Sequence, residues 1–96
     1  TNAQAKSFGS IISLENGNAE LSVIKPAENS SGWIIRIYNP TSKPSGNTLK
    51  INIPEVRLYE TNLEEIIESE VPINNGSANI RIEPWKIKTF LMKANR

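Results

Sequence analysis

Apolar residues alternate with polar ones along most of this chain, in short runs that end at turn residues. In the clearest run, Leu49, Ile51 and Ile53 fall on one side of an extended backbone, and Lys50 and Asn52 fall on the other. Successive side chains of a β-strand point to opposite faces, so a period of two predicts a strand with one buried face. Because no run keeps the 3.6-residue period over the length of an ordinary helix, the pattern predicts an all-β protein.

Turn residues divide the chain into short segments. Asn16-Gly17 and Asn75-Gly76 supply the positive φ of a tight turn, and Pro26 and Pro54 end two of the alternating runs. Residues 63–69 fit a single helical turn about as well as an extended segment, and we assign them as extended or irregular. Short strands separated by turns predict an antiparallel β-sandwich of immunoglobulin-like size, with a small closed barrel as the alternative.

The apolar side of each run is expected to form the core. Trp33 and Trp85 share the phase of Ile35 and Ile87, which favours packing inside the domain over a sugar-stacking platform on its surface. For the two tyrosines, packing and sugar stacking stay equally open. The predicted core residues are Leu21, Val23, Ile35, Ile37, Leu49, Ile51, Ile53, Ile80, Ile82 and Ile87.

A chain of 96 residues makes one domain. We expect residues 1–7 to be a flexible lead or a cloning remnant, and residues 8–96 to form a single β-sandwich domain. The formal net charge of +1 gives no reason to expect nucleic acid or a membrane as a partner. No apolar run approaches the length of a membrane span, and no signal peptide opens the sequence. The compartment stays open, with a bacterial cytoplasm as the expectation.

Three residue types that carry much of enzyme chemistry are missing. The sequence contains no cysteine, no histidine and no aspartate, since all 10 acidic residues are glutamates. Ser-His-Asp and Cys-His arrangements therefore cannot be built. A metal site would have only glutamate, asparagine and carbonyl oxygens, a set that suits only a hard cation. We predict no catalytic, substrate-binding or metal-binding residues in this chain, and no cofactor.

The densest group of charges consists of glutamates between the middle of the chain and the second Asn-Gly turn. Such a group is compatible with a calcium site or with the carboxylate pair of a glycosidase. A catalytic acid needs an apolar pocket that favours its protonated form, and only Ile66 and Ile67 supply apolar surface nearby. We therefore favour a solvated face that protects an edge strand by charge. The group consists of Glu60, Glu64, Glu65, Glu68 and Glu70.

Three segments, in this order, carry a resemblance to a known family. The first is Arg36-Ile37-Tyr38-Asn39-Pro40-Thr41, the second is Tyr59-Glu60-Thr61-Asn62-Leu63, and the third is Pro84-Trp85-Lys86-Ile87-Lys88-Thr89. Together they resemble the C-terminal β-domain of the glycoside hydrolase family 38 α-mannosidases. The resemblance covers roughly residues 15 to 93, which is nearly the whole chain.

This resemblance implies a role without catalysis. Enzymes of the family hydrolyse α-mannosides with retention of configuration, using a zinc ion and an aspartate nucleophile in an N-terminal α/β barrel. The resemblance therefore implies a non-catalytic fragment of a larger enzyme, with the other domains of the parent α-mannosidase as its partners and zinc in the parent's catalytic domain. The alternative is a carbohydrate-binding module that recognises glycans on its own.

Four apolar residues lie out of phase with the predicted core. They are expected on the outer face of the domain, where a free monomer has no reason to place them. We predict that they form the interface with the rest of the parent enzyme, and that the isolated chain self-associates in concentrated solution. The residues are Ile34, Tyr38, Phe90 and Met92.

Overall fold

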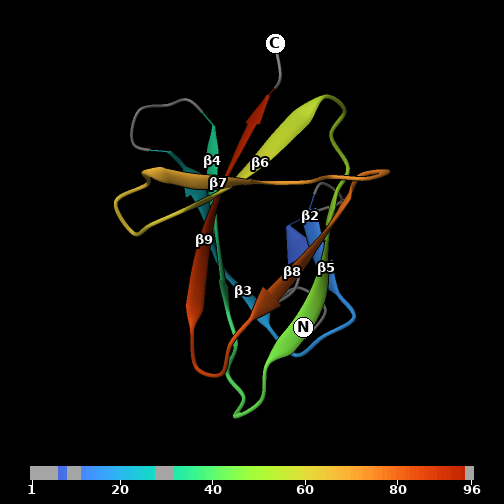
Figure 1. Ribbon diagram of the computed structural model, residues 1–96. Helices are drawn as coiled ribbons and strands as arrows, with labels where there is room; N and C mark the ends of the chain where they lie inside the picture. The colour runs from blue at the N-terminus through green and yellow to red at the C-terminus, as the bar shows by residue number, and fades with distance from the viewer. Residues whose placement is uncertain (1–6, 9–11, 28–31, 95–96) are drawn as a thin grey trace.

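Two antiparallel sheets packed face to face make up the domain (Figure 1). The computed structural model describes residues 7–8, 12–27 and 32–94, and those residues form nine strands and no helix. The predicted β-sandwich is thus confirmed, and the closed barrel is not formed. Nearly all of the predicted N-terminal lead lies outside the described residues. Over the described part of the chain, no helix has the length and apolar character that a membrane span requires.

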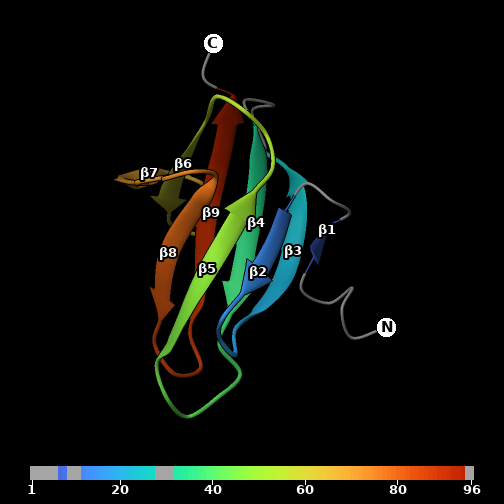
Figure 2. The ribbon, with the colours of Figure 1, turned by 90° about the vertical axis from the view of Figure 1, so that its right-hand side faces the viewer.

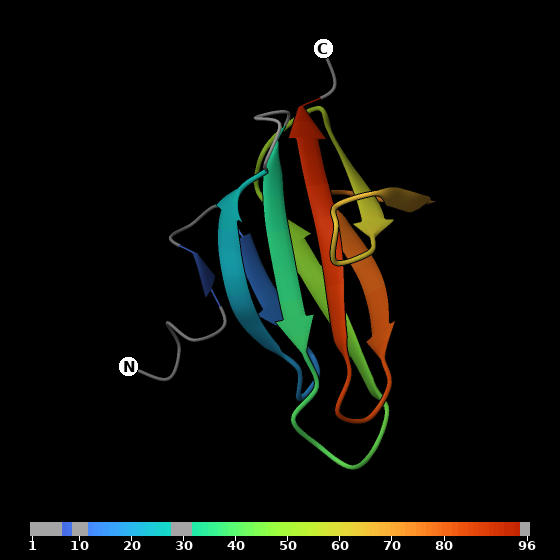
Figure 3. The same cartoon turned by 90° about the vertical axis from the view of Figure 1, so that its left-hand side faces the viewer.

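The chain changes sheet at most of its connections. One sheet has the order β1-β2-β5-β8 and the other the order β3-β4-β9-β6-β7. Figure 2 shows the four-stranded sheet in front, and Figure 3 shows the five-stranded sheet in front. The strands are β1 (Ser7–Phe8), β2 (Ile12–Glu15), β3 (Glu20–Pro26), β4 (Trp33–Tyr38), β5 (Ser45–Ile51), β6 (Val56–Thr61), β7 (Ile67–Val71), β8 (Ser77–Ile82) and β9 (Ile87–Ala94).

Aliphatic side chains from both sheets fill the space between them. Burial of these side chains is the main favourable term in folding a domain of this size. Six of the ten predicted core residues are buried here, and Leu21 and Ile53 are half-buried against the same cluster. The buried members of the cluster are Ile12, Leu14, Ala19, Ile35, Ile37, Leu49, Ile51, Leu58, Ala78, Ile80, Ile82, Phe90 and Met92.

Both Asn-Gly dipeptides form turns, as predicted. Asn75 and Gly76 have φ values of 53° and 76°, and Asn74 and Ser77 exchange hydrogen bonds of 2.8 and 3.0 Å across them. Two successive positive φ angles are those of a type I′ hairpin turn. At the other turn, a Cβ on Gly17 would overlap the side chain of Asn47. Glycine is required there because the backbone packs directly against β5.

A β-bulge in β3 changes which residues face the core. Leu21 pairs with Ile37, but the register shifts between Leu21 and Val23, so that Ile24 pairs with Ile35. A bulge inserts one extra residue and reverses the side-chain alternation that follows it. The prediction of Val23 as a core residue is therefore wrong, because Ile24 faces the core in its place.

The phase of β9 is the opposite of the predicted one. Phe90 pairs with Ile35 and lies in the core, whereas Ile87 pairs with Tyr38 and is 54% exposed. The prediction took Trp85 as part of the strand, but Trp85 lies in the turn before β9 and is 60% exposed. The placement of Ile87 and Trp85 in the core was therefore wrong.

The segment from residue 63 to residue 69 was the ambiguous one. Residues 63–66 form the loop between β6 and β7, and Ile67 opens β7. The extended or irregular assignment is confirmed. All but the last residue of β7 are exposed, which is typical of a strand at the edge of a sheet.

Truncation of Ile37 and of Ile87 to alanine should distinguish the buried face of the five-stranded sheet from its exposed face. Ile37→Ala removes atoms from a side chain with no exposed surface, and we expect it to cost about 2–5 kcal/mol in the free energy of unfolding. Ile87→Ala is the matched control and should change that free energy by about 0.5 kcal/mol or less. Urea unfolding of both variants measures the difference, and equal losses would contradict the observed phase of β9.

Candidate functional site

The three segments that carry the family resemblance meet on one face of the five-stranded sheet. We call this the outer face, meaning the face that points away from the four-stranded sheet (Figure 3). Arg36 of β4 pairs with Thr89 of β9, which pairs with Thr61 of β6. Each of these residues comes from a different segment. Three segments that are far apart in the sequence therefore meet in one row of residues paired across the strands.

Asn39, the residue that follows β4, joins the first and third segments through hydrogen bonds. Its side-chain Nδ2 donates to the carbonyls of Lys43 and Ile82, at 2.7 and 2.9 Å, and its Oδ1 accepts from the N–H and the hydroxyl of Thr41. Its backbone N–H donates to Lys86 O, and its carbonyl accepts the N–H of Trp85, both at 3.0 Å. The Asn-Pro-Thr sequence therefore ties the loop after β4 to the end of β8 and to the turn before β9.

Asn62 shapes the loop between β6 and β7 in a similar way. Its Oδ1 accepts the N–H groups of Glu64 and Ile66 at 2.8 and 3.0 Å, and its backbone N–H donates to Ile66 O. Glu65 then reaches Lys25, with 4.0 Å between the carboxylate and the ammonium group. Lys25 lies on β3, which is separated from β6 by β9 and β4, so this contact places the loop across the outer face (Figure 3).

The structure changes the predicted interface, because three of its four residues are buried. Ile34 does lie on the outer face, but it is buried in a small second cluster with Ala27 and Leu91. Phe90 and Met92 lie in the main core, because the phase of β9 is reversed. Burial removes these three residues, Ile34, Phe90 and Met92, from the predicted interface. Of the four predicted residues, only Tyr38 is half-exposed on the outer face. The prediction that all four form an exposed patch was therefore wrong.

Two donors within the cross-strand row are buried without an acceptor in the described part of the chain. They are Nε of Arg36 and the hydroxyl of Thr89. A buried donor that lacks an acceptor costs free energy, and native proteins leave few such groups. Sequence reasoning did not identify this pair, because threonine in a strand ordinarily reflects β-propensity alone.

The large apolar side chains that remain exposed lie mostly beside the three segments. Ile87 is on the outer face next to Tyr38, and Trp85 is in the turn that leads to it. Leu63, Ile66 and Ile67 belong to the loop after β6 and the start of β7. Exposed apolar surface gathered in one region is typical of a site that contacts another molecule or domain.

The two tryptophans do not form one platform. Trp33 opens β4, where it pairs with Met92, and is 42% exposed. Trp85 is hydrogen-bonded to Asn39 beyond the other end of the same strand. Six residues of extended chain separate these positions, which corresponds to about 20 Å. A shared sugar-stacking surface is therefore not available to them.

The five glutamates do not converge on one site. Glu60 is 3.9 Å from Lys88, Glu65 pairs with Lys25, and Glu70 is 3.2 Å from Arg57. Glu64 and Glu68 are exposed. The described residues contain no group of three acidic or other metal-ligating side chains that could hold an ion. Glu68 and Glu70 on β7 fit the interpretation of a solvated, charge-bearing edge, whereas the Glu65 side chain is only 12% exposed.

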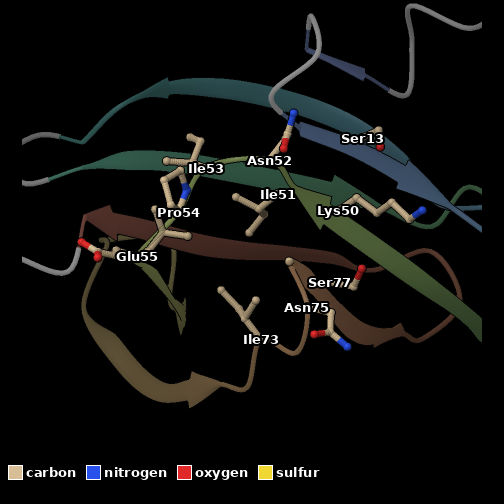
Figure 4. A pocket seen from close by; sticks show the side chains of 12 residues that line it. Ser13, Lys50, Ile51, Asn52, Ile53, Pro54, Glu55, Ile73, Asn75 and Ser77 are labelled. Atoms are coloured by element: carbon tan, nitrogen blue, oxygen red, sulfur yellow. The ribbon is translucent and has the colours of Figure 1, made fainter.

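A hollow of about 770 Å³ lies where β5 ends and β6 begins. Figure 4 shows Ile51 and Ile73 directed toward one another across it. Its charged lining residues are Lys50 and Glu55. A single carboxylate cannot perform glycoside hydrolysis, which uses two. The hollow is the open end of the sandwich, where aliphatic side chains such as Ile51 and Ile73 lie beside the polar Asn52 and Asn75.

The family comparison agrees with this architecture. Residues 18–90 match the model of the glycosyl hydrolases family 38 C-terminal beta sandwich domain. The chain belongs to this family. Neither the curated proteins nor the solved structures contain a match to it. This family 38 sandwich domain is a non-catalytic part of a glycoside hydrolase, and the matched segment includes all three segments that meet around the Arg36–Thr89–Thr61 row.

The role of Asn39 in the family 38 domain can be tested by truncation. Asn39→Ala removes four side-chain hydrogen bonds, including the one to the buried end of β8 at Ile82 O, so we expect a loss of about 2–4 kcal/mol in the free energy of unfolding. Asn79→Ala, at an exposed position of β8, is the control and should be nearly neutral. Chemical unfolding followed by tryptophan fluorescence measures both. A neutral Asn39→Ala would show that the loop is held by other contacts.

Proposed function

We propose that this chain is the non-catalytic C-terminal domain of a retaining α-mannosidase, and that it stabilises the parent enzyme by packing against its other domains. The observation that carries the proposal is the family match over residues 18–90. The absence of aspartate, histidine and cysteine supports it from the chemistry, because a zinc site and an aspartate nucleophile must then lie elsewhere in the parent. Zinc is expected in the parent's catalytic domain and not here.

A carbohydrate-binding module is the second candidate. The exposure of Trp33 and Trp85 favours it, because an exposed indole face can stack on a sugar ring. Their separation along β4 argues against a shared site, and each tryptophan would have to bind alone. Titration of the isolated chain with yeast mannan, followed by tryptophan fluorescence, decides between the candidates. Saturable quenching would favour the binding module.

The isolated chain should release no p-nitrophenol from p-nitrophenyl α-mannoside, with or without added zinc. The reason is that the chain offers glutamate as its only carboxylate and that those carboxylates are dispersed. The measurement is absorbance against a buffer blank, with the full-length parent as the positive control. Activity that purifies with the chain would contradict the non-catalytic assignment.

Removal of this domain from the parent tests the structural part of the proposal. The truncated parent should lose activity faster on heating than the intact enzyme, because an interface between domains adds to the stability of both. The half-life of mannosidase activity at a fixed raised temperature is the measurement. Equal half-lives would mean that the domain does not stabilise the enzyme.

A further inference from the structure

We propose that Trp85 is the anchor through which this domain docks on the rest of its parent enzyme. The inference rests on the proposed function and adds the face and the chemistry of the contact. Trp85 combines two unfavourable properties, a strained backbone and an exposed apolar side chain. Trp85 has φ of 62°, and its side chain is 60% exposed.

The local backbone gives no reason for a tryptophan here. Lys86 N–H donates to Glu83 O at 3.2 Å, which closes a turn with Pro84 and Trp85 at its centre. Proline followed by a residue of positive φ defines a type II turn, and that second position favours glycine or asparagine. Two of the other non-glycine residues with positive φ are the asparagines Asn16 and Asn75. A bulky side chain in this conformation is strained, and such strain collects at functional positions.

Burial within the domain gives no reason either, because most of the indole surface faces solvent. When a residue has an unfavourable backbone conformation and is not buried in its own domain, we expect a contact with a partner to stabilise it. Tryptophan is also the residue type most enriched among those that dominate binding energy at protein interfaces. The combination of strain and exposure at one tryptophan therefore points to a partner that buries it.

The turn presents Trp85 rigidly. Its backbone N–H donates to Asn39 O, and the neighbouring Lys86 carbonyl accepts the N–H of Asn39, both at 3.0 Å. Asn39 is itself buried and held by four side-chain hydrogen bonds. A side chain whose support is already ordered loses little conformational entropy on binding, which is the property of a preorganised contact.

The surroundings of Trp85 favour a protein partner over a sugar. Ile87 is 54% exposed two residues further on, and Tyr38 lies opposite it on the outer face. Glu83, two residues before Trp85, is already paired with Arg81 at 2.8 Å. A sugar site needs several free polar groups that converge on hydroxyls, whereas an apolar anchor fits an apolar pocket.

The partner is the remainder of the same polypeptide. The family describes a C-terminal domain of larger enzymes, so the two partners are covalently linked and meet at a high effective concentration. Lys86, exposed beside Trp85, adds a positive charge to the contact. The complementary surface is therefore an apolar pocket of the parent with a carboxylate at its rim.

Trp85→Gly should have opposite effects in the isolated chain and in the parent. In the isolated chain, glycine relieves the strained φ, so the midpoint of urea unfolding should stay the same or rise. In the full-length enzyme, loss of the anchor should shorten the half-life of activity on heating by about tenfold. Glu55→Gly, at another exposed position of positive φ and outside the three segments, is the control and should leave that half-life within about twofold.

Several outcomes would overturn the proposal. An unchanged parental half-life in Trp85→Gly, or an equal loss in Glu55→Gly, would remove Trp85 as the anchor. Quenching of the isolated chain by yeast mannan that disappears in Trp85→Gly would assign the residue to a sugar. Dimerisation of the isolated chain that Trp85→Gly abolishes, with the parent unaffected, would assign it to a second copy.

The truncated parent separates this inference from the proposed function. If truncation shortens the half-life and Trp85→Gly does not, the domain stabilises the enzyme through another face, and only the inference fails. If truncation itself has no effect, the proposed function fails as well. A shorter half-life in both variants, with the isolated Trp85→Gly chain as stable as the unmodified one, supports both.

Discussion

The end of the domain where β4 ends and β9 begins depends on the hydrogen bonds of Asn39. One buried amide side chain holds the loop that leaves β4, the carbonyl at the end of β8 and the loop's own Thr41. Its backbone groups hold the turn before β9. Buried polar groups of this kind stabilise only when every donor and acceptor is engaged, and here all of them are. The crossing from one sheet to the other and the entry to the central strand are therefore fixed by the same residue.

Much of the fold could be predicted from the alternation of apolar and polar residues. The run from Leu49 to Ile51 and the turn at Asn75-Gly76 were correctly predicted because local pattern and final structure agree there. Val23 was misplaced because a bulge leaves no mark in composition, and only the pairing of β3 with β4 reveals it. Ile87 and Phe90 were exchanged because both faces of β9 are apolar, so that periodicity alone could not select the buried face.

The candidate site was only partly predictable for a related reason. The three segments were recognised as a set, but their meeting in the row of Arg36, Thr89 and Thr61 depends on strand order, which periodicity does not contain. The burial of Ile34 depends on its packing with Ala27 and Leu91, which lie on other segments of the chain. The exposure of Trp85 depends on its turn. A tryptophan in phase with a strand was read as a core residue because burial is the common fate of that residue type.

The position of β9 in its sheet has a consequence for how the domain forms. β9 follows all eight other strands in sequence, yet it lies between β4 and β6 at the centre of the five-stranded sheet. On the ribosome, β3 with β4 and β6 with β7 can pair as hairpins, but the sheet that unites them cannot close until β9 has been synthesised. Until then β4 and β6 each present an open edge. In a chain that stops short of β9, the five-stranded sheet is therefore left as two separate hairpins.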